Sequence, residues 1–249
     1  MAVTIKNSQE ISLMRESNRL LARVHEELSR MIEPGVPTVQ IDREGERLIR
    51  SLGGVPNFLH YNGYPASVCV SVNEEVVHGI PSEDRILREG DIVSLDAGLI
   101  YKGYHSDAAR TYGVGEISRQ DRELIEAARD SFFEGIKNAR AGRHLREIGA
   151  AIYKCAKERG FGVIRDLTGH GIGKEMHEDP DVPNFPTKRQ GLLLVPGMTL
   201  AVEPMLSAGT EKVRWLTDGW TVVTADGSKA AHYENTILIT EGEPEILSL

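Results

Sequence analysis

The stretch DIVSLDAGLIYKGYHSDAARTY, residues 91–112, decides the fold. It begins with an apolar, β-branched run that ends at Asp96, and Asp107 follows eleven residues later, just before a second such run. The segment from Gly98 to Gly103 between them is typical of a hairpin with its turn near Gly103. Such a hairpin sets the two aspartates on paired strands, close enough to share an ion.

Other β-branched runs surround this hairpin, separated by Asn, Gly and Pro, a pattern that predicts an antiparallel sheet. They lie on both sides of it in the chain. Before the hairpin come 68–72 and 76–77, and after Gly160 come 200–202, 220–223 and 236–239.

Helical periodicity predicts two pairs of helices. In the first pair, apolar residues recur at helical spacing over 7–31, and Thr38 can cap a second helix that Gly53-Gly54 closes. In the second pair, a capping box at Ser118 opens one helix, and Leu145 begins the apolar stripe of the next. Both pairs are therefore followed by strands.

Two helices followed by strands occur twice, in residues 1–115 and in 116–249. A duplicated α+β domain is the economical interpretation. No Pro/Ser-rich linker or low-complexity segment divides the halves, so we expect one domain over 1–249 with a site between its pseudo-repeats.

Composition narrows the class of protein. The formal charge is -8 without a long Lys/Arg run, which argues against a nucleic-acid or membrane-surface protein. No apolar run approaches the roughly 20 residues that span a bilayer, and residues 1–6 lack a signal-peptide core. The 2 cysteines are too few for a disulfide framework or a Cys-rich zinc site. We expect a cytoplasmic protein.

Two further acidic residues, Glu203 and Glu234, lie at the end of or inside apolar strand runs. Strands disfavour Asp and Glu, and an unpaired buried carboxylate is costly. For any one of the four acidic residues, a solvated strand face or a salt bridge is an equally good explanation. Taken together, two divalent cations would balance their four charges, which favours a dinuclear metal site.

His170 stands in TGHGIG, residues 168–173, where the flanking glycines let the backbone approach a ligand or ion closely. Oxygen-rich ligation with one imidazole suits Mn, Fe(II), Co or Zn better than Ca or Mg. Two metals with a bridging water would generate hydroxide near neutral pH as the nucleophile for peptide-bond hydrolysis. The spacing of His78 and His177 does not by itself place either at the metals.

Three rival motifs are absent. Thr168 stands where a Walker loop needs its first Gly, and Asp181 stands where an H-E-x-x-H motif needs its second His. No G-x-S-x-G occurs. These absences weaken the nucleotide-binding, single-zinc and serine-hydrolase interpretations.

Over almost its whole length the chain resembles the type I methionine aminopeptidases, subfamily A of peptidase family M24. The resemblance implies their pita-bread fold, a pseudo-two-fold duplicated α+β fold in which two pairs of helices cover a curved antiparallel sheet. It rests on seven motifs in matching order: NEEVVHGIP (73–81), DAG (96–98), Asp107, GHGIG (169–173), HEDP (177–180), EPM (203–205) and ENT (234–236).

The resemblance implies two divalent metal ions per chain, with Co, Mn, Fe(II) and Zn as candidates. Asp107 and Glu234 would bridge both ions. Asp96 would chelate one ion, and His170 with Glu203 would hold the other.

The resemblance also implies catalytic and binding roles. His78 and His177 would bind the substrate backbone and stabilise the tetrahedral intermediate, and Glu203 would handle protons of the bridging water. Met176 stands before His177, where many relatives have Phe. The expected methionine pocket consists of Tyr61, Tyr64, Cys69, Trp220 and Phe58.

The implied activity is that of a methionyl aminopeptidase, which hydrolytically removes the initiator methionine from nascent proteins when the second residue is small. The expected partners are N-terminal methionyl peptides, either free in solution or on the ribosome, and neither nucleic acid nor a membrane is expected as a partner. The expected oligomeric state is a monomer. Two alternatives stay open. One is a shortened prolidase-like enzyme that cleaves X-Pro bonds, and the other is an inactive pita-bread protein that binds peptides, ribosomes or nucleic acid.

Overall fold

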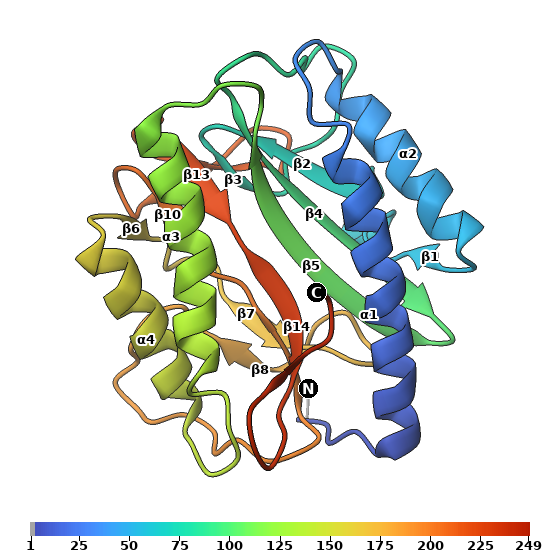
Figure 1. The fold of residues 1–249 in the computed structure, drawn as a ribbon, viewed down its shortest axis with the longest axis vertical. Coiled ribbons are helices and arrows are strands. Elements are labelled where there is room, and N and C mark those ends of the chain that lie inside the picture. The colour runs from blue at the N-terminus through green and yellow to red at the C-terminus, as the bar shows by residue number, and fades with distance from the viewer. Residues whose placement is uncertain (1–2) are drawn as a thin grey trace.

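Two pairs of long helices flank the central strands of the computed structural model, which describes residues 3–249 (Figure 1). Met1 and Ala2, part of the stretch expected to lack a signal-peptide core, lie outside the described residues. Among residues 3–249, no helix is long and apolar enough to cross a membrane. The helices are α1 (Ser8–Ser29), α2 (Thr38–Ser51), α3 (Arg119–Ile136), α4 (Leu145–Glu158) and the short 3-10 helix η1 (Tyr61–Gly63).

The starts of α3 and α2 differ in how they are capped. Ser118 caps α3, because its hydroxyl accepts a hydrogen bond from the backbone N–H of Asp121 at 3.1 Å. The predicted capping box is only half formed, since the Asp121 carboxylate accepts from the Ser118 hydroxyl and from Lys229. Thr38 does not cap α2, and that prediction was wrong. Pro37 is the N-cap residue, while the Thr38 hydroxyl accepts from the backbone N–H of Ser82 at 2.9 Å and so ties the helix start to a neighbouring loop.

The largest sheet has nine strands, and every strand pairing within residues 3–249 is antiparallel. Its order is β1-β4-β5-β14-β9-β7-β8, with β2 also paired to β4 and β15 to β14. These strands are β1 (Val55–Pro56), β2 (Val68–Val72), β4 (Ile92–Tyr101), β5 (Tyr104–Gly113), β7 (Gly169–Gly171), β8 (Glu178–Val182), β9 (Thr199–Val202), β14 (Glu234–Leu238) and β15 (Glu245–Ile246).

Two smaller sheets have three strands each. One has the order β13-β10-β6 and the other β11-β12-β3. Their bounds are β13 (Ala230–His232), β10 (Met205–Ser207), β6 (Gly162–Val163), β11 (Val213–Trp215), β12 (Val222–Thr224) and β3 (Glu75–Val77).

The predicted hairpin is present as β4 and β5. Its two turn residues, Lys102 and Gly103, have φ angles of 49° and 81°. Positive φ at both central positions is typical of the two-residue hairpin turn whose twist matches that of the strands. The hairpin prediction is confirmed, with the turn where the sequence placed it.

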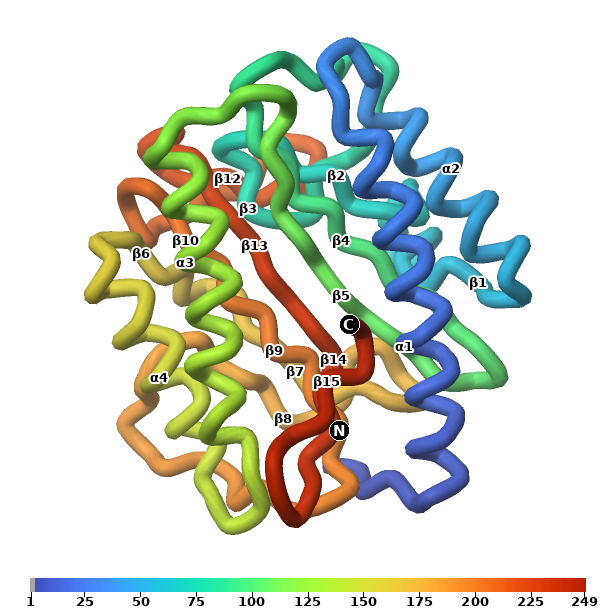
Figure 2. The backbone as a smooth tube through the Cα atoms, in the orientation of Figure 1, coloured from blue at the N-terminus to red at the C-terminus, as the bar shows by residue number. Residues whose placement is uncertain are grey.

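Each helix pair packs its apolar face against a different part of the sheet. Between the pairs, the segment through β13 and β14 runs from top to bottom (Figures 1 and 2). Burying one large apolar side chain stabilises the fold by about 1.5–3 kcal/mol. The hydrophobic cluster under the first helix pair includes Leu21, Val24, Leu28, Val70 and Leu95. The cluster under the second pair includes Phe132, Ile148, Ile152, Leu200 and Ile237. The predicted α+β arrangement with two pairs of helices is confirmed.

Candidate functional site

The five residues predicted to bind metal lie on or beside five neighbouring strands of the largest sheet. In sheet order they are Asp96 in β4, Asp107 in β5, Glu234 at the start of β14, Glu203 directly after β9, and His170 in β7. Strand pairing therefore assembles into one row residues that are far apart in the chain.

The strand register sets these side chains on one face. Ala109 of β5 lies opposite both Asp96 of β4 and Glu234 of β14. Asp107 precedes Ala109 by two residues, and side chains two apart in a strand point to the same face. The same two-residue offset occurs between β7 and β9, because His170 lies opposite Ala201, two residues before Glu203. The expectation that the two aspartates lie close together on paired strands is confirmed.

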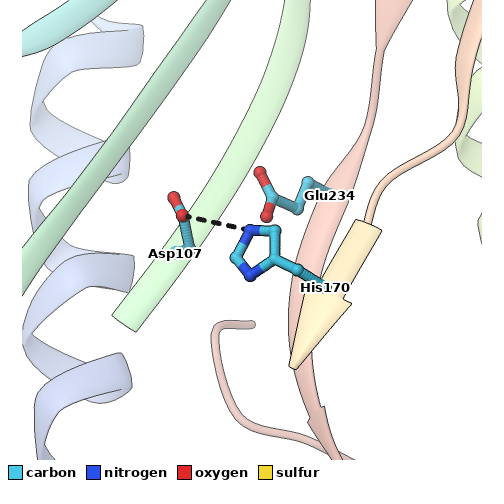
Figure 3. A group of neighbouring side chains, drawn as sticks. All are labelled: Asp107, His170 and Glu234. Carbon is cyan, nitrogen blue, oxygen red and sulfur yellow. Dashed lines mark ion pairs between the residues drawn. The ribbon is translucent and has the colours of Figure 1, made fainter. Parts of the chain in front are cut away.

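Asp107, His170 and Glu234 form the tightest group, and all three are buried. One possible ligand atom from each lies within 4.8 Å of the others. Figure 3 shows the three side chains converging from three different strands. His170 Nε2 lies 3.9 Å from Asp107 Oδ2 and 3.6 Å from Glu203 Oε1. Together with Asp96, these residues line one cavity of about 280 Å³.

Another part of the cavity wall is apolar and aromatic. The Tyr64 and Trp220 rings meet edge to face with centroids 5.2 Å apart. His78 and His177 also line the cavity. The predicted pocket residues are all in its wall, and Met176 joins them: Phe58, Tyr61, Tyr64, Cys69, Met176 and Trp220.

Hydrogen bonds orient two histidine rings of the cavity. His170 Nδ1 lies 2.9 Å from the carbonyl oxygen of Gly171. Because a carbonyl only accepts, Nδ1 carries the proton, and Nε2 presents its lone pair to the carboxylates. His177 Nδ1 lies 2.8 Å from the Tyr61 hydroxyl, and its ring centroid is 4.2 Å from that of His170.

His78 is held at the cavity by an unusual backbone turn. Its φ of 59° lies in the left-handed region, which is uncommon for a residue with a side chain and recurs at functional sites. The next residue must be glycine, because a Cβ on Gly79 would lie 2.5 Å from the carbonyl oxygen of Val70. The His78 ring then packs edge-on against Trp220, with centroids 6.2 Å apart.

The glycines that flank His170 serve strand packing. A Cβ on Gly169 would lie 2.3 Å from the carbonyl oxygen of Ala201, and one on Gly171 would lie 2.3 Å from that of Asp179. The close approach that they permit is therefore to the backbone of neighbouring strands. The sequence had suggested an approach to a ligand or ion.

The buried acidic groups favour their neutral forms. Burial raises the pKa of Asp96 to about 7 and that of Glu203 to about 8. Burial, and then the neighbouring carboxylates, raise the pKa values of Asp107 and Glu234 well above their ordinary range. Burial lowers the pKa of His170 to about 3, so its ring is neutral at neutral pH.

These residues fit a divalent metal ion. Asp96 Oδ1 and Asp107 Oδ1 are buried oxygens with no hydrogen-bond partner among the described residues. Such atoms are costly unless something pairs with them. A cation beside them would favour the charged carboxylates, and a neutral imidazole is the form that binds metal.

One histidine at this site was not predicted from the sequence. His232 is buried, and its Nε2 lies 3.6 Å from Glu203 Oε2 and 3.9 Å from Glu234 Oε2. The available signal was its position two residues before Glu234, since residues two apart in an extended segment share a face.

Comparison with known proteins assigns the family. Residues 12–241 match the family model of metallopeptidase family M24. The chain is 49% identical to the methionine aminopeptidase of Clostridium acetobutylicum over 247 residues, which covers 99% of both chains. Its fold matches the crystal structure of methionine aminopeptidase from Thermotoga maritima with a TM-score of 0.97 at 43% identity, over 99% of both chains.

A prolidase-type relative is more distant. The Xaa-Pro dipeptidase from Bacillus anthracis has a TM-score of 0.80 and 28% identity, and only 61% of its length is covered. The full-length fold match to methionine aminopeptidases confirms the expected pita-bread fold. The chain therefore belongs to metallopeptidase family M24, among the bacterial type I methionine aminopeptidases.

Proposed function

We propose that this chain removes the initiator methionine from new polypeptides by metal-dependent hydrolysis of the first peptide bond, when the second residue is small. One observation carries the proposal. A single cavity joins the row of carboxylates and His170 to a pocket of aromatic and sulfur-bearing side chains. The family's activity, methionine removal, needs both ends of such a cavity.

Two divalent ions are part of this proposal. Asp107 and Glu234 would bridge them, with Asp96 on one ion and His170 and Glu203 on the other. The sheet order supports this division, because the two bridging residues stand in the middle of the row, between Asp96 and the other pair. When bound, the ions supply Lewis-acid polarisation of the scissile carbonyl and a water of lowered pKa. Co, Mn, Fe(II) and Zn all suit these ligands.

His78 and His177 would act as neutral hydrogen-bond donors. Burial lowers the pKa of His78 to about 4 and also lowers that of His177. If the Tyr61 hydroxyl donates to Nδ1 of His177, the ring proton stays on Nε2, where it can be donated to the substrate backbone or to the developing oxyanion. Glu203, as the carboxylate beside the bridging water, would take up a proton from that water and pass it to the leaving amine.

The apolar end of the cavity would bind the methionine side chain through dispersion and sulfur–aromatic contacts. The Tyr64 hydroxyl donates to the carbonyl oxygen of Gly79 at 2.9 Å, which satisfies its polar end and leaves its ring for apolar contact. Met176 is 3% exposed and packs in the same cluster, so it belongs to the proposed pocket wall.

The wider setting of the reaction belongs to the same proposal. The substrates would be methionyl peptides of nascent chains in the cytoplasm, free or at the ribosome, and the chain would act as a monomer. Residues 1–249 would form a single domain with pseudo-repeats at 1–115 and 116–249.

Peptide hydrolysis tests the proposal. The metal-loaded protein should release methionine from Met-Ala-Ser and much less from Met-Leu-Ser. Absence of methionine release from Met-Ala-Ser would contradict the proposal. A preference for Gly-Pro would establish the prolidase-like alternative, and failure to bind any divalent ion under anaerobic conditions would revive the inactive binding protein.

A further inference from the structure

His232 is a buried imidazole whose hydrogen-bonding groups are unused by the protein. The residue is 1% exposed, and neither ring nitrogen has a hydrogen-bond partner among the described residues. A neutral imidazole always carries one N–H, and a buried donor without an acceptor is costly. An acceptor is therefore expected close to one of the two nitrogens.

Only small movements separate His232 from such an acceptor. Its Nε2 lies 3.6 Å from Glu203 Oε2 and 3.9 Å from Glu234 Oε2, just beyond hydrogen-bond distance. Glu203 thus stands between two imidazoles, because its other oxygen, Oε1, lies 3.6 Å from His170 Nε2.

The two imidazoles cannot play the same part. The proton of His170 is on Nδ1, where the Gly171 carbonyl oxygen accepts it, so His170 Nε2 has a lone pair and no hydrogen to donate. Of the two rings beside the Glu203 carboxylate, only His232 can donate to it.

The backbone holds His232 in place for this role. Its N–H donates to the Thr111 hydroxyl at 2.8 Å, and its carbonyl oxygen accepts from the same hydroxyl at 2.9 Å. His232 also pairs across the sheet with Met205, two residues after Glu203. The backbone of His232 is therefore fixed relative to the segment that carries Glu203.

We propose that His232 is a positioning residue of the metal centre: its Nε2–H donates to Oε2 of Glu203 and so turns Oε1 toward the metal ions. This inference rests on the proposed function, because it assigns a partner to a proposed metal ligand. Carboxylates that bind metal are commonly held by such hydrogen bonds, whose loss weakens metal binding about 10–100-fold.

Three variants of the full chain test the role of His232. His232→Leu removes the donor at similar volume, and His232→Gln keeps an N–H donor. His25→Leu is the matched control, because His25 is also a buried histidine. It lies on helix α1, and its Nε2 donates to the carbonyl oxygen of Ala108 at 2.8 Å. Mn(II) affinity is measured by calorimetry, which does not depend on catalysis, and kcat and KM for Met-Ala-Ser are measured alongside.

We expect His232→Leu to weaken Mn(II) binding by about 10–100-fold and to lower kcat more than it raises KM. His232→Gln should recover most of the affinity, and His25→Leu should match the wild type. Unchanged affinity in His232→Leu would overturn the proposal, as would equal losses in the Leu and Gln variants. If His232→Leu does not fold, the test uses His232→Gln instead, with its Mn(II) affinity and the absorption spectrum of Co(II) bound to it as the two measurements. An unchanged spectrum and near wild-type affinity support positioning, and an altered spectrum indicates that His232 is itself a ligand.

Failure of this inference differs from failure of the proposed function. A wild-type chain that binds no divalent ion contradicts the proposed function. A wild-type chain that binds Mn(II) while His232→Leu binds it equally well contradicts only the role of His232.

Discussion

Lys6 Nζ lies 2.6 Å from Glu178 Oε2, and both side chains are almost fully buried. Glu178 directly follows His177, and its other oxygen accepts from the backbone N–H of Lys174 at 2.9 Å. The segment before α1 is thereby tied to the loop that carries a proposed substrate-binding histidine.

Replacing Lys6 with Met should lower the free energy of unfolding by about 3 kcal/mol, because it leaves the Glu178 carboxylate buried without its cation. Denaturant unfolding measures the change. Lys174→Met is the control, since Lys174 is exposed and contacts Glu10 at 3.3 Å; its free energy of unfolding should stay close to that of the wild type. Equal losses of unfolding free energy in the two variants would show that the buried Lys6–Glu178 pair stabilises the fold no more than the exposed pair does.

Tyr61→Phe should lower kcat about tenfold, equivalent to about 1.4 kcal/mol, with little change in KM. The variant keeps the ring in the pocket wall but removes the hydroxyl 2.8 Å from His177 Nδ1, which orients the imidazole. Steady-state kinetics with Met-Ala-Ser measure both constants. Tyr153→Phe, on α4, is the control and should change neither. A rise in KM alone for Tyr61→Phe would mean that the hydroxyl serves binding only.

Asp107→Asn should abolish stable metal loading and activity together, because Asp107 stands between Asp96 and Glu234 in the row of ligands and would bridge both ions. Elemental analysis after dialysis measures the bound metal. Asp166→Asn, at an exposed position, should retain the wild-type metal content. Unchanged metal content in Asp107→Asn would count against the bridging role.

The metal-free protein should become less stable as the pH rises from about 7 to about 8.5. In this window unfolded histidines, with an ordinary pKa of about 6.5, are mostly neutral, as are His170 and His232, whose folded pKa values burial lowers to about 3 and about 4. Glu203 and Asp96, with folded pKa values of about 8 and about 7, still hold protons that the unfolded chain has lost.

The folded state therefore binds more protons than the unfolded state in this window. The free energy of unfolding then falls by up to about 1.4 kcal/mol per pH unit for each such carboxylate, until the pH passes its folded pKa. Thermal unfolding in chelator measures the trend, and saturating Mn(II) should remove it. A melting temperature in chelator that is constant or rises over this window would contradict the raised pKa values.

Local patterns predicted local structure well. The β4–β5 hairpin follows from a β-branched run, two glycines and a second run, and the Ser118 cap follows from a four-residue motif. Thr38 was misplaced as a cap because its hydroxyl has a long-range partner, Ser82, that no local pattern reveals.

Long-range pairing was beyond the sequence. Nothing in the residues near Glu234 indicates that β14 lies between β5 and β9, and this order is what completes the row of ligands. His232 was missed for a related reason, because its importance depends on Glu203, which β10 and β13 bring beside it. The pseudo-repeat boundary near residue 115 stays a prediction.

Reconstitution of the metal-free protein tests the central claim most directly. The chain is stripped with a chelator, and methionine release from Met-Ala-Ser is followed anaerobically as Mn(II), Co(II), Fe(II) or Zn(II) is added. We predict no release without metal, recovery with at least one of these ions, and no recovery for Asp107→Asn. Full methionine release by the stripped wild-type protein, or equal recovery by Asp107→Asn, would contradict the claim that this cavity removes methionine with bound metal.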